Sequence, residues 1–130
     1  MLLNLVRQQY IFSYNVTEEW PLGNRWEELE VAKIPNEGGA LRLMRRVDEF
    51  STRIMGRGEL MNSRTHGSED ALGRLACEPY AKHAAARVLM GGLGMGFTLA
   101  TALQSLGASA KVEVAELVPG VVAWNQRYIG

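Results

Sequence analysis

The sequence predicts an α/β protein in which a small antiparallel β-meander precedes the opening of a doubly wound parallel sheet. Residues 26–66 alternate polar and apolar positions between clusters of turn residues, which is typical of short antiparallel strands. Residues 67–130 instead combine helical spacing with a short apolar run that leads into a glycine-rich loop. We therefore divide the chain into an N-terminal extension (residues 1–25), a β-meander (26–66) and a partial nucleotide-binding domain (67–130).

Composition and charge narrow the possible functions. Apolar residues form 47% of the chain, and 14 Lys and Arg balance 14 Asp and Glu. A chain without net charge lacks the long-range field that draws proteins onto nucleic acid or acidic membranes, so we expect neither as a partner. No apolar run reaches the roughly 18 residues of a membrane span, and we find no export signal. The single cysteine, Cys77, argues against disulfides and cysteine-based metal sites and favours a cytoplasmic location.

The meander is predicted from its turns. Residues 35–39 form a turn cluster between two alternating segments, which favours a hairpin. A second turn at residues 56–58 separates two further short segments. The four predicted strands cover residues 28–34, 41–45, 49–55 and 59–62. Residues 1–24 show no clean periodicity, so no element is predicted there.

The second half predicts an alternating order of helices and strands. Glu69 and Asp70 lie where a helix would begin, and acidic residues favour the first turn of a helix. The apolar run before the glycines is typical of a strand buried on both faces of a parallel sheet. The predicted helices cover residues 68–77, 97–106 and 121–128, and the predicted strands cover residues 87–90 and 111–117.

The glycine loop and an acid beyond it form the candidate binding site. Glycines let the backbone turn sharply and let a ligand approach main-chain N–H groups at the start of the next helix. Glu116 lies about 20 residues further on, at the end of the next strand, where a carboxylate can accept hydrogen bonds from ribose hydroxyls. The alternative, purely structural interpretation is that the glycines allow a close helix–sheet contact and that Glu116 is a solvated acid at the end of a strand. The candidate cofactor-binding residues are Gly92, Leu93, Gly94, Gly96, Glu116 and Leu117.

The glycine spacing separates the nucleotide classes. The loop follows G-x-G-x-G, and Phe97 and Thr98 stand where a dinucleotide fingerprint has its third glycine. This spacing favours S-adenosylmethionine over NAD. No Gly-Lys-Ser or Gly-Lys-Thr follows the glycines, which argues against a nucleoside triphosphate.

Residues 88–96 and 114–117 resemble the nucleoside-binding half of spermidine synthase and its relatives with the class I methyltransferase fold, which is Rossmann-like. That family also carries a β-meander before its nucleotide domain, so the resemblance covers about residues 26–130. It implies a small-molecule nucleoside ligand, S-adenosylmethionine or its decarboxylated form. It also implies that glycines 92, 94 and 96 lie along the ligand and that Glu116 holds the ribose.

The chain departs from the family in three places. Polyamine synthases carry an aspartate in the glycine loop to receive the amine of the decarboxylated cofactor, where this chain has Leu93 and Met95. The Tyr-His-Glu triplet of the family has only a partial counterpart in residues 65–67. The catalytic aspartate of the family would lie downstream of residue 130. Since the attacking amine must first lose a proton, we assign no catalytic residue and expect the 130-residue chain to be inactive in polyamine synthesis.

The remaining polar residues favour structural roles. His66 with Glu69 and Asp70 is interpreted as a helix start rather than a metal site. Arg42, Arg45 and Arg46 are interpreted as a solvated strand face rather than an anion site.

The partial domain predicts a partner. Only two strands are expected after residue 86, which leaves an unpaired edge and an uncovered apolar face. We therefore expect either truncation or a homo-oligomer joined through the sheet edge. Two other functions stay open: a non-catalytic oligomerising module, and a fragment of an NAD-dependent oxidoreductase.

Overall fold

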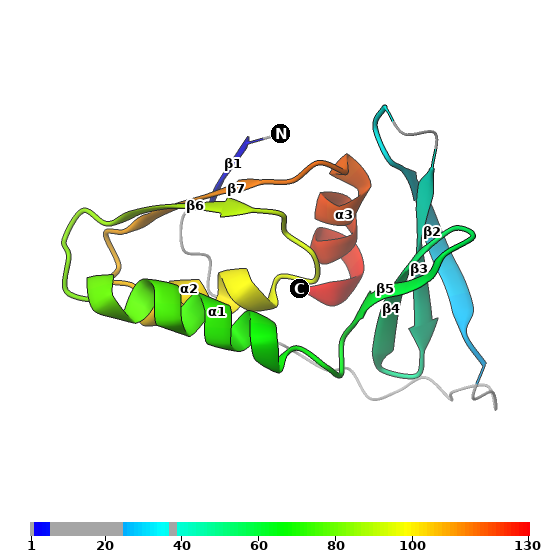
Figure 1. Cartoon of the computed structure of the whole chain (residues 1–130), viewed down its shortest axis with the longest axis horizontal. Helices are drawn as coiled ribbons and strands as arrows, with labels where there is room; N and C mark the ends of the chain where they lie inside the picture. The colour runs from blue at the N-terminus through cyan, green and yellow to red at the C-terminus, as the bar shows by residue number, and fades with distance from the viewer. Residues whose placement is uncertain (1, 6–24, 37–38) are drawn as a thin grey trace.

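The structure is a computed structural model that describes residues 25–36 and 39–130, and residues 2–5 at the level of the backbone. It confirms a mixed α/β chain with a four-stranded antiparallel sheet in the order β2-β3-β4-β5 (Figure 1). A second sheet has the order β1-β7-β6. The strands are β1 (Leu2–Leu5), β2 (Glu27–Lys33), β3 (Ala40–Arg46), β4 (Glu49–Ile54), β5 (Gly58–Asn62), β6 (Arg87–Gly91) and β7 (Lys111–Ala115).

Three α-helices alternate with the later strands. The helices are α1 (Gly67–Cys77), α2 (Phe97–Ser105) and α3 (Pro119–Trp124). A 3-10 turn at Glu78–Tyr80 follows α1, and a π-helical turn at Asn125–Ile129 follows α3. The predicted third helix was therefore placed correctly but begins earlier, at Pro119, and ends in a different helical form. Proline suits a first helical turn because its missing N–H would have no partner there. Within the described ranges, no helix is both long and apolar enough to cross a membrane.

The N-terminal segment contains a strand for which no prediction came from the sequence. Leu2–Leu5 pair antiparallel with β7, in register from Leu2↔Ala115 to Leu5↔Val112. Strand β6 pairs with β7 in parallel on its other side. The edge of β7 is therefore covered, and the sheet has three strands where two were expected. Residues 1 and 6–24 of the predicted extension lie outside the described residues.

The prediction that the first parallel strand is buried on both faces was wrong for the described chain. Helices α1 and α2 lie along one face of the β6–β7 pair (Figure 1). That face is closed by Val112 and Val114, which are 2% and 0% exposed. On β6, Leu89 is 69% exposed, because no described element covers the opposite face. The predicted uncovered apolar face is thus present.

Two groups of buried side chains form the core. One lies between α1, α2 and the parallel strands and includes Cys77, Leu99 and Ala102. The other lies between α3 and the antiparallel sheet and includes Leu43 and Trp124. Leu93 of the glycine loop packs against both groups. The loop therefore lies at the junction between the two halves of the molecule.

Candidate functional site

The glycine loop has a backbone that requires its glycines. The φ angles of Gly92, Gly94 and Gly96 are 85°, 56° and 82°, in the left-handed region that L-residues with side chains rarely adopt. These alternate glycines explain the G-x-G-x-G spacing in the sequence. A Cβ atom on Gly91 or Gly92 would meet no atom within 4 Å, so this part of the backbone is open to a ligand.

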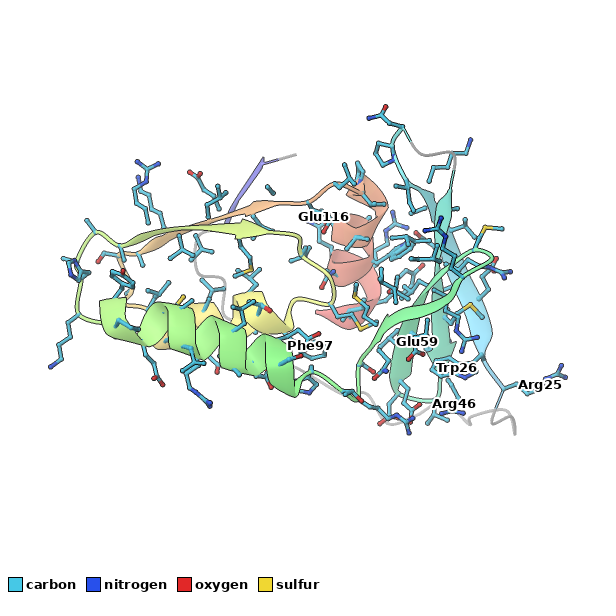
Figure 2. The ribbon with its side chains drawn as sticks, viewed as in Figure 1. Arg25, Trp26, Arg46, Glu59, Phe97 and Glu116 are labelled. Atoms are coloured by element: carbon cyan, nitrogen blue, oxygen red, sulfur yellow. The ribbon has the colours of Figure 1, made fainter. Side chains whose placement is uncertain are left out.

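Glu116 lies directly against the glycine loop. The backbone N–H of Leu93 donates a hydrogen bond of 2.7 Å to Glu116 Oε2, and the N–H of Val118 donates one of 2.8 Å to Oε1. The two predicted parts of the site, 23 residues apart in the sequence, are thus joined. β7 ends at Ala115, two residues before the predicted end, because the chain turns here to reach α3. Figure 2 shows Glu116 where β7 leads into α3.

The intervening loop residues have divided roles. Leu93 is half-buried in the core, and Met95 is 7% exposed. Their apolar side chains therefore contribute to packing. Leu93 contributes its backbone N–H to the site. Leu117, the last predicted site residue, is 64% exposed beside Glu116.

Asn125 fastens the loop and was not predicted. Its Nδ2 donates hydrogen bonds of 2.7 Å to the Gly94 carbonyl and 2.9 Å to the Val121 carbonyl. Its Oδ1 lies only 3.2 Å from where a Cβ on Gly96 would stand. An asparagine directly after the buried Val121–Trp124 stretch was the available signal, but the sequence gives no indication of a partner 31 residues away.

A cavity of about 270 Å³ opens beside the loop, between β5 and the first turns of α1 and α2. It mixes apolar side chains with one carboxylate. Its walls are formed by residues 91–95, Leu60, Met61, Asn62, Glu69, Phe97 and Thr98. Met61 approaches the loop closely, because its sulfur would lie 3.3 Å from a Cβ on Gly94. Glu116 is not among the lining residues, but Leu93, whose N–H it accepts, is one of them.

His66 belongs to a hydrogen-bond network beside this cavity. Its ring stacks on Phe97 with centroids 4.0 Å apart, and its Nδ1 lies 2.7 Å from Asp70 Oδ2. The Thr101 hydroxyl donates to the other oxygen of Asp70 at 3.3 Å. Asp70 thus ties α1 to α2 and orients the imidazole. In the described part of the chain, no group of three or more His, Cys, Asp or Glu side chains is placed to bind a metal.

Glu69, one residue earlier, points to a different environment. The Ser68 hydroxyl donates a 2.7 Å hydrogen bond to its Oε2. That bond, and a hydrogen bond from its own backbone, lower the pKa of the Glu69 carboxyl below its usual value. The carboxylate is therefore ionised at neutral pH.

The arginines of β3 form ion pairs on the outside of the meander. Arg42 pairs with Glu28, and Arg45 pairs with Glu27 at 3.1 Å. Arg46 pairs with Glu49 at 2.8 Å and also lies 4.6 Å from the ring centroid of Trp26. Figure 2 shows Trp26 and Arg46 together at one end of the antiparallel sheet. The interpretation as a solvated strand face agrees with the exposed pairs of Arg42 and Arg45, whereas Arg46 and Glu49 are partly buried.

No family model, curated protein or solved structure matches the chain. The function is therefore proposed from the glycine loop, Glu116 and the cavity.

Proposed function

We propose that the chain is a spermidine-synthase-like protein of transferase ancestry that binds S-adenosylmethionine or its decarboxylated form. The observation that carries this proposal is the carboxylate of Glu116, held against the glycine loop by the N–H of Leu93 at 2.7 Å. An acid at the end of the second parallel strand, next to such a loop, suits the two hydroxyls of a ribose. The resemblance of residues 88–96 and 114–117 to the family supports the same ligand class.

The hydrogen bonds to Glu116 leave room for the ribose. Each carboxylate oxygen accepts one backbone N–H, and an ionised carboxylate offers about four acceptor positions. Two positions therefore stay available for hydroxyl donors. The open backbone at Gly91 and Gly92 lets the nucleoside come close to the main chain.

We interpret the parallel pair of β6 and β7, connected through α2, as the first βαβ unit of a methyltransferase-like domain. The register from Arg87↔Lys111 to Gly91↔Ala115 brings the carboxyl ends of both strands to the same edge. In open α/β sheets, ligands bind beyond the carboxyl ends of the strands. The loop after β6 and Glu116 after β7 both lie at this edge.

Aminopropyl transfer requires more than binding, since the attacking amine must lose a proton before it can form a bond. We assign no side chain of this chain to that step. The proposal is therefore nucleoside binding, and we expect no polyamine synthesis from the 130-residue chain.

Titration calorimetry tests the proposal. We expect saturable binding of S-adenosylmethionine or its decarboxylated form to the wild-type chain, and none of NAD. The Glu116→Ala variant should bind at least about tenfold more weakly, because hydrogen bonds to a charged group are worth about 1.5–3 kcal/mol. Glu113→Ala, on the same strand, is the matched control and should bind like the wild type. Tight NAD binding would instead support an oxidoreductase fragment.

A non-catalytic oligomerising module is the second candidate. The observation that favours it is the uncovered apolar face of β6, where Leu89 is 69% exposed. Light scattering on the same samples distinguishes the two candidates. An oligomer that binds no nucleoside would support assembly as the function.

A further inference from the structure

The cavity beside the glycine loop has a single charged side chain in its described wall, and that charge is negative. Glu69 supplies the carboxylate, whereas the other lining side chains are apolar, glycine, amide or hydroxyl. No lysine, arginine or histidine lines it among the described residues. A space of this kind favours a cationic group carried on an apolar arm.

Asn62 of β5 also lines this wall, and its side-chain amide already has hydrogen-bond partners within the protein. Its Nδ2 donates to Glu59 Oε1 at 2.8 Å. Its Oδ1 accepts the backbone N–H groups of Arg64 and Thr65 at 3.0 and 2.9 Å. Asn62 therefore has little capacity left for a ligand, and Glu69 is the principal charged group that could meet one.

We propose that Glu69 receives the terminal ammonium group of the nucleoside ligand, in place of the aspartate that the glycine loop lacks. This assignment rests on the proposed function, because it assumes a nucleoside held at Glu116 beside the same loop. Leu93 lines the cavity and also donates its N–H to Glu116, so a ligand that lies along the loop can hold its ribose at Glu116 and its arm in the cavity. Met61 and Phe97 line the cavity and offer apolar contact for the methylene groups of the arm.

The position of Glu69 also has a purely local explanation. An acidic residue in the first turn of α1 stabilises a helix through the helix dipole. That effect accounts for the residue type at the helix start, but it is the same for any acid in the turn, including Asp70. Asp70 turns toward His66 and Thr101, whereas Glu69 lines the cavity. The two explanations differ in what a charge-neutral substitution does to ligand affinity.

The test compares two thioethers whose sulfur is uncharged and which differ in the aminopropyl arm. S-adenosyl-3-thiopropylamine carries the ammonium arm, and 5′-methylthioadenosine has the same nucleoside without it. We expect Glu69→Gln to weaken the first by about tenfold to a hundredfold, as for a lost charged hydrogen bond, and to change the second less than twofold. Glu78→Gln, at the other end of α1, is the matched control and should affect neither ligand.

The outcomes separate this assignment from the proposed function. Glu69→Gln could weaken the binding of both thioethers equally, or leave the binding of S-adenosyl-3-thiopropylamine unchanged. Either result would overturn the assignment of Glu69 and leave the proposal of nucleoside binding intact. If neither thioether binds the wild-type chain, the proposed function fails and the assignment fails with it. Thermal melts by circular dichroism on each variant show whether a loss of affinity reflects unfolding.

Discussion

Val47 occupies a backbone conformation that its side chain disfavours. It lies in the tight turn between β3 and β4 with φ of 58°. A left-handed conformation costs an L-residue roughly 1–2 kcal/mol, and asparagine tolerates it better than a β-branched residue. We therefore expect Val47→Asn to raise the free energy of unfolding by about 0.5–1 kcal/mol, measured by urea denaturation.

Val31 provides the matched control for this turn. Its exposure, 51%, is close to the 54% of Val47, but it lies in extended β2. Asparagine is disfavoured in strands, so Val31→Asn should lower stability. A similar change in the free energy of unfolding of both variants would contradict the claim that the backbone of Val47 is strained.

Glu59 links the stability of the meander to pH. The Ser51 hydroxyl and then the Asn62 amide donate hydrogen bonds to its carboxylate, and with the nearby Arg53 they lower its pKa below the usual 4.5. A carboxyl with a lower pKa in the folded state stabilises the fold above its unfolded pKa, and this stabilisation is lost as the pH falls through the folded pKa. We expect the urea midpoint of the wild type to fall more than that of Glu59→Gln between about pH 5 and about pH 3.

The size of the Glu59 effect is limited by solvent, because its side chain is exposed and exposed pairs contribute less than about 1 kcal/mol. Ser51→Ala removes the largest cause of the lowered pKa and should flatten the pH dependence in the same way. Parallel curves for all three proteins would contradict this linkage.

The sequence predicted single residues best where the backbone itself demands them. The glycines at 92, 94 and 96 have positive φ, and Glu116 meets their loop as expected. Asn125 and Glu30 were missed, although both make well-placed hydrogen bonds. Their partners lie 31 and 94 residues away, and no local pattern marks a contact of that range.

At the scale of elements, alternation and glycine punctuation predicted the four strands of the meander and the order of the later helices and strands. β1 was missed because a four-residue edge strand carries too little periodicity to stand out. The exposed face of β6 was misjudged for a related reason. A continuous apolar run indicates that a strand suits burial, but the number of layers that cover it depends on distant parts of the chain.

The crossing of α1 and α2 depends on one glycine. A Cβ on Gly73 would lie 2.6 Å from the Thr98 carbonyl oxygen and 2.9 Å from Thr101 Cβ. Overpacking of this kind costs about 1–3 kcal/mol, and the better helix propensity of alanine offsets about 1 kcal/mol. We expect Gly73→Ala to lower the free energy of unfolding by up to about 2 kcal/mol in chemical denaturation.

Gly67 is the control for this crossing, because it lies in the same helix and a Cβ there would meet nothing within 4 Å. Gly67→Ala should leave stability unchanged or raise it. If both alanine variants lose stability equally, the loss in Gly73→Ala is not caused by the close approach of the two helices.

At the scale of the whole molecule, α3 connects the antiparallel sheet to the glycine loop. Trp124, 1% exposed, packs on the sheet, and Asn125 next to it holds the Gly94 carbonyl. A Cβ on Gly120 would come within 2.4 Å of Ala32 Cβ, so α3 lies unusually close to β2. The meander and the loop are therefore supported by the same short helix, and a change at their interface should reach the site.

Glu30 of β2 tests this connection, since it accepts hydrogen bonds from three side chains at the C-terminal end of the chain. Trp124 Nε1 donates to it at 3.0 Å, the Tyr128 hydroxyl donates at 3.0 Å, and Arg127 pairs with it. Glu30→Ala leaves the buried indole N–H without an acceptor, which costs about 1–3 kcal/mol. We expect that loss in urea unfolding followed by tryptophan fluorescence, together with weaker nucleoside binding.

Two further variants decide whether the effect belongs to this contact. Glu28→Ala removes a glutamate of the same strand that pairs with the exposed Arg42 alone, so it should cost less than about 0.5 kcal/mol. Glu30→Gln keeps an acceptor oxygen for Trp124 and should fall between the wild type and Glu30→Ala. Glu30→Ala could lose stability and still bind the nucleoside as tightly as the wild type. In that case the hydrogen bond from Asn125 to Gly94 persists when Trp124 is less firmly held. The meander would then stabilise the fold without positioning the loop.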